Sequence, residues 1–202
     1  MTMRLAMPDT VRTLPLCEPA RAVQEYAKII AELRDAPDGS AADLEAVASE
    51  AVDAARAGGA FLMAVVTPPD AAPALLTGAV LEVPPSWSVD TAELLRDSLE
   101  DVGGPDVRET ITLDTGLGPA VIVQRVPGAE QARERRPLAL QLQAFIPEPG
   151  TGRMLLLTLA CPSAAGWAAH QLLFGQLVAS ANASRHLPPP IEDSFEHHTY
   201  RL

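Results

Sequence analysis

The spacing of apolar residues along the chain predicts four helices. Between residues 18 and 35, apolar residues recur every three or four positions and form one stripe, made of Val23, Tyr26, Ala27, Ile30 and Leu33. The same periodicity predicts helices over 41–57, 90–101 and 163–184. Ser40 and Ser163 are predicted N-caps, and Asp90 with Glu93 forms a capping-box-like pair at the start of the third helix.

Six shorter apolar runs predict β-strands at 60–67, 74–83, 107–114, 120–126, 138–146 and 153–161. The run at 138–146 alternates, with Leu138, Leu140, Leu142, Ala144 and Ile146 on one face and Gln141, Gln143 and Phe145 on the other. The run at 153–161 is apolar on both faces, which favours a central strand covered by helices on both sides. Short loops rich in glycine and proline connect the later strands and favour antiparallel neighbours.

These elements predict an α+β fold, specifically an α/β/α sandwich with a mostly antiparallel sheet of about six strands. Residues 1–17 show no clear period and are interpreted as an extended N-terminal arm. Residues 18–185 form a single globular domain, and residues 186–202 form a C-terminal tail with few core residues. The tail is interpreted as a segment that orders on a partner, packs back on the domain or stays disordered.

Composition narrows the function classes. The chain has 202 residues, a formal net charge of −11 and 48% hydrophobic residues, which suits one folded domain and excludes a disordered chain. Nucleic-acid binding needs a concentrated basic surface, so the acidic balance argues against it. Residues 1–8 lack the apolar core of a secretory signal, and prolines interrupt the most apolar stretch at 61–83. We therefore expect a cytoplasmic protein that does not bind a membrane.

Candidate chemistry is sparse. Cys17 and Cys161 have no metal-ligand spacing. Cys161 is expected to behave as a small buried hydrophobe, and a disulfide between it and Cys17 is the alternative. Gly116-Leu-Gly118 lies between two strands, which favours a turn over a phosphate-binding loop. His170 lies near Ser163, yet we interpret it as a half-exposed packing residue rather than a catalytic base. We expect no cofactor and no metal site, including at the adjacent tail histidines.

The second half of the chain carries a resemblance to a known family. Its residues are the hairpin ITLDTGLGPAVIVQRV at 111–126, the strands LQLQAFIP at 140–147 and LLLTLACPS at 155–163, and the following helix. This succession resembles small actinobacterial proteins of the PsbP-like superfamily, which includes Ran-binding Mog proteins, the photosystem subunit PsbP and LpqN-type mycobacterial lipoproteins. The resemblance covers about residues 59–184 and implies an α/β/α sandwich with a binding or assembly role. It brings no active site, and the missing lipobox cysteine implies no lipid anchor.

A group of arginines is the sharpest local anomaly in this acidic chain. The residues are Arg125, Arg133, Arg135, Arg136 and Arg153, all near the ends of predicted strands. If the hairpins pair as predicted, several of them gather at one end of the sheet and form a docking site for an acidic partner or a second copy of the chain. The alternative is a solubilising hairpin tip paired with nearby glutamates, and both interpretations stay open. Phe195 and Tyr200 in the tail are further candidate contacts.

Three functions follow from these observations. The first is a non-enzymatic protein-interaction module, such as an adaptor, chaperone or structural component of a bacterial secretion or contractile-injection assembly. The second is an immunity or antitoxin-like inhibitor, because an acidic chain suits a basic toxin surface. The third is an enzyme whose site is assembled from scattered residues around His170 or the acidic helices.

Overall fold

The computed structural model describes residues 2–34, 41–83, 87–127, 139–184 and 196–200. Its largest part is a seven-stranded sheet in the order β2-β3-β4-β8-β7-β6-β5, and every neighbouring pair is antiparallel. The strands are β2 (Val11–Thr13), β3 (Ala60–Val66), β4 (Ala74–Glu82), β5 (Val107–Thr115), β6 (Gly118–Arg125), β7 (Leu140–Glu148) and β8 (Arg153–Cys161). The predicted α+β class and the central place of 153–161 are confirmed. The seventh strand is β2, which carries no readable period.

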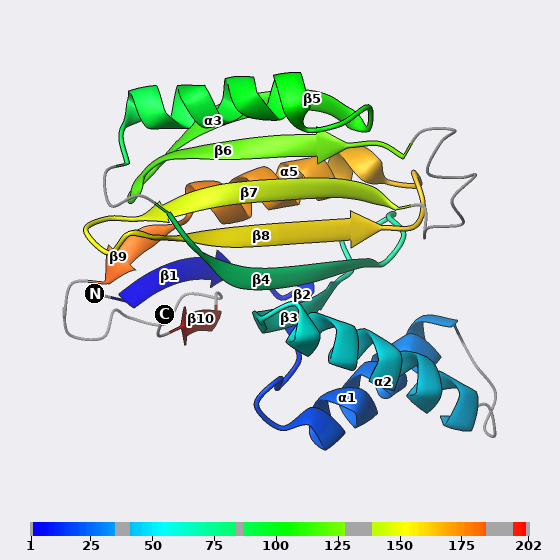
Figure 1. Cartoon of the computed structure of the whole chain (residues 1–202). Coiled ribbons are helices and arrows are strands. Elements are labelled where there is room, and N and C mark those ends of the chain that lie inside the picture. Colours follow the sequence, from blue (N-terminus) through cyan, green and yellow to red (C-terminus); the bar gives the residue numbers. More distant parts are fainter. Residues whose placement is uncertain (1, 35–40, 84–86, 128–138, 185–195, 201–202) are drawn as a thin grey trace.

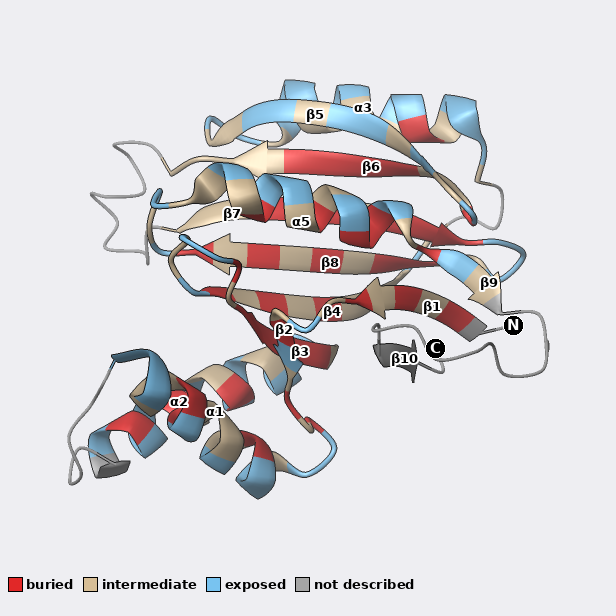
Figure 2. Ribbon diagram, turned by 180° about the vertical axis from the view of Figure 1, so that it is seen from behind, coloured by how far each residue is buried: buried red, intermediate tan, exposed pale blue. Residues whose placement is uncertain are grey.

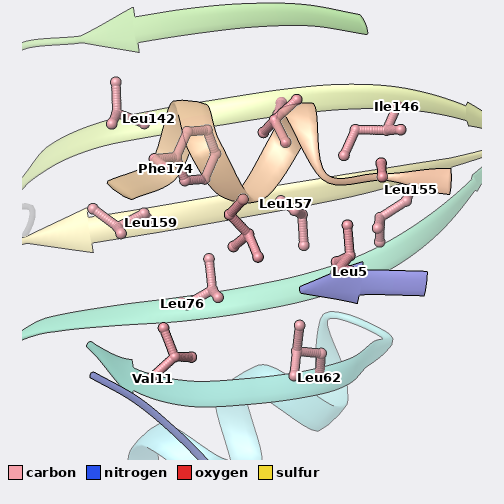
Figure 3. Close-up of a cluster of buried hydrophobic side chains, with 14 of the residues drawn as sticks. Leu5, Val11, Leu62, Leu76, Leu142, Ile146, Leu155, Leu157, Leu159 and Phe174 are labelled. Atoms are coloured by element: carbon pink, nitrogen blue, oxygen red, sulfur yellow. The ribbon is translucent and has the colours of Figure 1, made fainter. Parts of the chain in front are cut away.

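The rear face of the sheet is covered by α5 (Trp167–Ala179) and by β1 (Thr2–Met7), as Figure 2 shows. Phe174, Leu177 and Val178 of α5 pack against the apolar alternation of β7 and β8. Figure 3 shows the centre of this core, where Leu142, Ile146, Leu155, Leu157 and Leu159 face the helix and Leu5. This face therefore holds the main hydrophobic core.

Three helices pack on the front face at its two sides (Figure 1). The pair α1 (Pro19–Arg34) and α2 (Ala41–Ala57) covers Met63 and Val65 of β3. At the other side, α3 (Val89–Val102) covers Val121 and Val123 of β6. The two clusters share no buried residue, so the front face has two separate small cores.

The N-terminal segment is part of the core and not a free arm. β1 pairs with β9 (Asn182–Ser184) on one side and with β10 (Glu196–Tyr200) on the other, in a second, three-stranded sheet. Met3, Leu5 and Met7 are buried in the main core, and the Ala6 N–H donates to Ser180 Oγ over 2.9 Å. The prediction of a separate arm was wrong because the partners of this strand lie 178 to 197 residues away in the chain.

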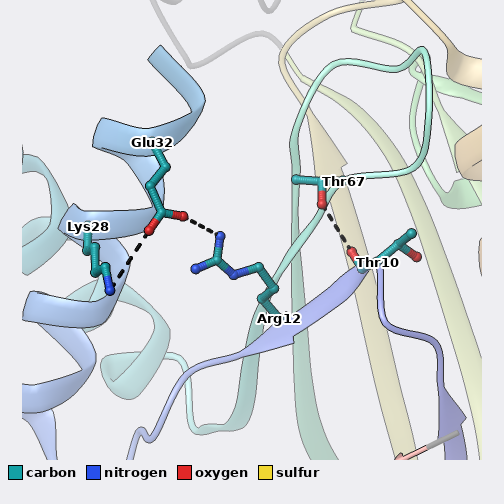
Figure 4. A network of polar contacts seen from close by, with 5 residues as sticks. All are labelled: Thr10, Arg12, Lys28, Glu32 and Thr67. Carbon is teal, nitrogen blue, oxygen red and sulfur yellow. Dashed lines mark hydrogen bonds and ion pairs between the residues drawn. The ribbon is translucent and has the colours of Figure 1, made fainter. Parts of the chain in front are cut away.

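The next strand connects the sheet to the first helix (Figure 4). Arg12 of β2 donates to Glu32 of α1 over 2.7 Å, and Lys28 lies 4.0 Å from the same carboxylate. Thr67 Oγ1 donates to the Thr10 carbonyl at 3.4 Å beside this pair. The two contacts to Glu32 are solvent-exposed, so they orient α1 more than they stabilise it.

Two predicted helix starts need correction. The N-cap of α3 is Ser88, whose Oγ accepts from the Thr91 N–H, so Asp90 and Glu93 are not its capping pair. The last helix begins at Trp167, after Gly166, and Ser163 Oγ instead accepts from the Ala165 N–H within the preceding loop. In the described part of the chain, no helix has the length and apolar character needed to cross a membrane.

Candidate interaction surface

The middle of the front face is not covered by any helix in the part of the chain that the structure describes. The uncovered strands β4, β8 and β7 lie between the α1–α2 pair and α3 (Figure 1). Their register places Thr77, Thr158 and Gln143 side by side in one row across the sheet. The next row along the strands contains Ala79, Leu156 and Phe145.

We call this surface the open strip. Pro147 and Met154 at one end of the front face are buried, so the open strip consists of the half-buried front-facing residues of the three strands: Leu75, Thr77, Ala79, Leu81, Leu156, Thr158, Ala160, Gln141, Gln143 and Phe145. All ten side chains are half-buried, whereas most of the alternate side chains of the same strands are fully buried under α5 and β1. Six of the ten are apolar, which leaves an apolar surface open to solvent at the centre of the sheet.

The open strip deepens next to α3 into a hollow of about 360 Å³. Its floor comes from Phe145 and Met154, and its wall comes from one side of α3. The complete lining is Leu81, Val83, Trp87, Thr91, Leu94, Leu95, Ser98, Phe145 and Met154. Trp87 is fixed in place because its Nε1 donates to the Pro119 carbonyl over 2.8 Å. Leu94, at the rim, is 67% exposed. We call this cavity the α3 hollow.

Of the helices beside the open strip, α3 and α2 are acidic, whereas α1 carries three cations and two carboxylates. α3 carries five carboxylates and one arginine: Asp90, Glu93, Asp97, Glu100, Asp101 and Arg96. α2 carries four carboxylates and one arginine: Asp43, Glu45, Glu50, Asp53 and Arg56. All nine carboxylate residues are exposed. An apolar floor between acidic walls suits a ligand that is apolar in its centre and basic at its ends.

Arg125 closes one end of the open strip and is held by internal contacts. Its Nε donates to Gln143 Oε1 over 2.9 Å, and its Nη1 donates to the Gly103 carbonyl over 2.8 Å. The same nitrogen lies 3.1 Å from Asp106 Oδ2. The guanidinium therefore joins the end of α3 to the sheet, and little of its charge is directed to solvent.

Arg153 lies at the opposite end of the sheet from Arg125. Arg125 is paired with Gln141 at the start of β7, whereas Arg153 is paired with Glu148 at its end. Seven residues of extended strand separate the two positions, or about 23 Å. The predicted gathering of these two arginines is therefore wrong. Arg153 instead braces the β7–β8 hairpin, with its Nη2 2.9 Å from Glu148 Oε2.

The remaining candidates of the arginine group, Arg133, Arg135 and Arg136, lie outside the described residues, as does Phe195. Tyr200 lies in β10, where its backbone is opposite Met3 of β1. The segment around Tyr200 therefore packs back on the domain in this structure.

His170 is a core residue and not the half-exposed side chain expected from the sequence. It is 0% exposed, and its Nε2 lies 2.7 Å from the Ala72 carbonyl. Among the described side chains, no hydrogen bond joins it to Ser163, and Nδ1 has no partner. Without access to solvent, this imidazole is not placed to act on a substrate.

The cysteines and the glycine turn behave as predicted. Cys161 is fully buried, Cys17 is exposed, and both are free thiols. Gly116 and Leu117 form the two-residue turn between β5 and β6, so no helix follows to bind a phosphate.

Fold and surface together define an α+β sandwich with an antiparallel sheet whose front face is half covered. No family model and no curated protein sequence matches this chain. Among solved structures, the chain is similar to PsbP (CyanoP) from Synechocystis sp. PCC 6803, at 12% sequence identity and a TM-score of 0.38. The match covers 62% of this chain and 75% of that chain. At these values, the similarity carries no conclusion about what this chain does.

Proposed function

We propose that the protein is a non-enzymatic interaction module whose open strip and α3 hollow receive an apolar segment of a partner protein flanked by lysine or arginine. The observation that supports this most directly is the contrast between the two faces of the same strands. α5 and β1 cover the main core on the rear face, whereas the front face leaves ten half-buried side chains at its centre. Adaptor, chaperone, assembly and toxin-inhibitor roles all belong to this class, and the partner's identity distinguishes them.

The size of the surface suits a segment of a partner rather than a small molecule. The open strip spans three strands, about 10 Å across, and continues into a hollow of about 360 Å³ lined mostly by apolar side chains. Burying a fully exposed leucine contributes about 1.5–3 kcal/mol, so Leu94 at the rim is an expected anchor. The exposed carboxylates on both sides then select for basic flanks and speed the encounter.

The test compares two leucines of equal exposure on opposite faces. Leu94 on α3 is 67% exposed at the α3 hollow, and Leu172 on α5 is 65% exposed on the rear side. A photo-crosslinking amino acid is placed at each position in turn, in the host cell. We expect one partner to be captured at position 94 and not at 172, through a peptide with apolar residues next to lysine or arginine.

The purified partner then provides the quantitative readout. Leu94→Glu is expected to weaken binding about 30-fold, because about 2 kcal/mol of apolar burial is lost, and Leu172→Glu is expected to leave it unchanged. Equal capture at both positions would refute the proposed function. So would a captured peptide with acidic flanks, or an affinity that Leu94→Glu does not lower.

A further inference from the structure

The longest exposed edge of the sheet is β5. It has nine residues, whereas β2 at the opposite edge has three. Among the described residues, no strand pairs with the outer side of β5, which borders the sheet in Figure 2. Soluble proteins protect long edge strands with proline, lysine or bulges. β5 has one irregularity, at Arg108, which has no partner in the ladder with β6, but neither proline nor lysine, so most of its edge is open for pairing.

The hairpin geometry fixes which backbone groups point outward. Asp114 lies opposite Pro119, which has no N–H, so this pair cannot exchange two hydrogen bonds with β6. The alternate pairs of the ladder therefore make those bonds. The N–H and C=O groups of Thr110, Thr112 and Asp114 then point away from β6, towards solvent. They form a row of unpaired donors and acceptors.

The strand is self-complementary about its central residue, Ile111. Arg108 and Asp114 lie three positions to either side of Ile111, and Thr110 and Thr112 lie one position to either side. When two copies run antiparallel about this point, each Arg108 is opposite an Asp114 and each Thr110 is opposite a Thr112. Opposite charges and threonine pairs are favourable across antiparallel strands. We infer that β5 pairs with β5 of a second copy and joins two seven-stranded sheets into one.

The pairing buries the side chain of Ile111. It is 45% exposed in the single chain, although it is a large apolar side chain on a strand. At the symmetry axis it occupies a pair without hydrogen bonds, where the two Cα atoms are about 4.5 Å apart and the side chains touch. It also lines a rear-side hollow of about 210 Å³ next to Phe174 and Gly175. Pairing therefore covers an apolar side chain and one wall of this hollow.

The helix on the front face leaves room for the second copy. α3 packs on Val121 and Val123 of β6, and Glu100 of α3 is hydrogen-bonded to Thr110 Oγ1 of β5. Its axis therefore lies over β6 or between β5 and β6. With strands about 4.8 Å apart, the two α3 axes are then about 10–14 Å apart across the symmetry axis. Packed helices approach to about 8–10 Å, so the two helices do not collide.

Charge reversal tests the pairing without depending on a single variant. In sedimentation velocity at rising concentration, the wild-type chain is expected to reach twice its mass of 21.3 kDa. Arg108→Asp and Asp114→Arg are each expected to weaken self-association at least tenfold, because each places like charges opposite one another at both ends of the interface. An equimolar mixture of the two variants is expected to regain the dimer, because every pair is then opposite in sign. This rescue cannot come from misfolding.

A backbone variant tests the same contact independently. Thr112→Pro removes an outward N–H and no bond to β6, so the fold is retained while the dimer is lost. Arg56→Asp on α2 is the matched control and leaves the dimer unchanged, since Arg56 is exposed on a helix far from β5 in the fold. A wild-type chain that stays at the mass of one chain refutes the inference. A dimer that survives Thr112→Pro, or a variant mixture without heterodimer, also refutes it.

Discussion

Two glycines of the last helix region, nine residues apart, should respond to alanine with opposite sign. Gly166 immediately precedes α5 with φ +72°, and a Cβ there would lie 2.3 Å from Ala71 Cβ and 2.4 Å from Ala71 Cα. The neighbouring backbone is fixed, because the Ala72 N–H donates to the Ala165 carbonyl over 3.0 Å. Gly175 lies within α5, and a Cβ there would meet no atom within 4 Å.

The magnitudes follow from these geometries. Gly166→Ala costs about 1–2 kcal/mol for the left-handed backbone and about 1–3 kcal/mol for overpacking, or about 2–5 kcal/mol together. Gly175→Ala gains about 0.8–1 kcal/mol from helix propensity, since the new methyl group has free space. The first change is a large fraction of the stability of an ordinary domain, which is about 5–15 kcal/mol.

Urea unfolding followed by the fluorescence of Trp87 and Trp167 measures both changes. We expect a lower midpoint for Gly166→Ala and a higher midpoint for Gly175→Ala, with unchanged slopes. If Gly166→Ala stays within about 0.5 kcal/mol of wild type, the contact with Ala71 does not constrain the chain as the structure indicates. If Gly175→Ala destabilises, the space beside α5 is filled.

Two further predictions concern single side chains. Burial raises the pKa of the Tyr26 phenol above its ordinary value, with the charge of Arg34 acting weakly in the opposite direction. The phenol therefore ionises first in the unfolded state, so the folded state loses stability as pH rises above about 10. Tyr26→Phe is expected to reduce the loss of stability measured between about pH 9 and 11. An identical loss in both proteins would contradict this. A thiol reagent is expected to modify only Cys17 in the native protein and to reach Cys161 only after unfolding. Two fast-reacting thiols in the native state would show that the core around Cys161 opens.

Local pattern was sufficient for the central sheet. The strand starts predicted at 60, 74, 107 and 153 coincide with those of β3, β4, β5 and β8, because alternation and glycine-rich turns are encoded within a few residues. The two N-terminal strands, β1 and β2, were missed. β2 has three residues, and β1 is defined by pairing with residues from 182 onward, which no local window contains.

The candidate site was harder to predict than the fold. The sequence pattern places Gln141, Gln143 and Phe145 on the face of β7 opposite the main core, which is a signal for a partly solvated face at the sheet centre. Which helices leave that face open depends on packing between distant segments. Arg125 and Arg153 do not come together for a simpler reason: successive antiparallel strands reverse direction, so the two residues lie at opposite ends of the sheet.

His170 shows how residue type can mislead where periodicity does not. It lies three residues after Trp167 and four before Phe174, so helical spacing puts it on the buried stripe. The carbonyl of Ala72, almost a hundred residues earlier, satisfies one ring nitrogen and makes that burial tolerable.

The position of β1 between β9 and β10 has a consequence for biosynthesis. Met3, Leu5 and Met7 are synthesised well before the strands that flank them, which begin at residues 182 and 196. At about 5–20 residues per second, this apolar segment waits roughly 10–35 seconds for its first neighbouring strand. During that interval, the nascent chain carries an unpaired, aggregation-prone strand at residues 2–7. Completion of this sheet is therefore coupled to synthesis of residues 182–200, and a truncated chain that ends before residue 182 would expose the same segment permanently.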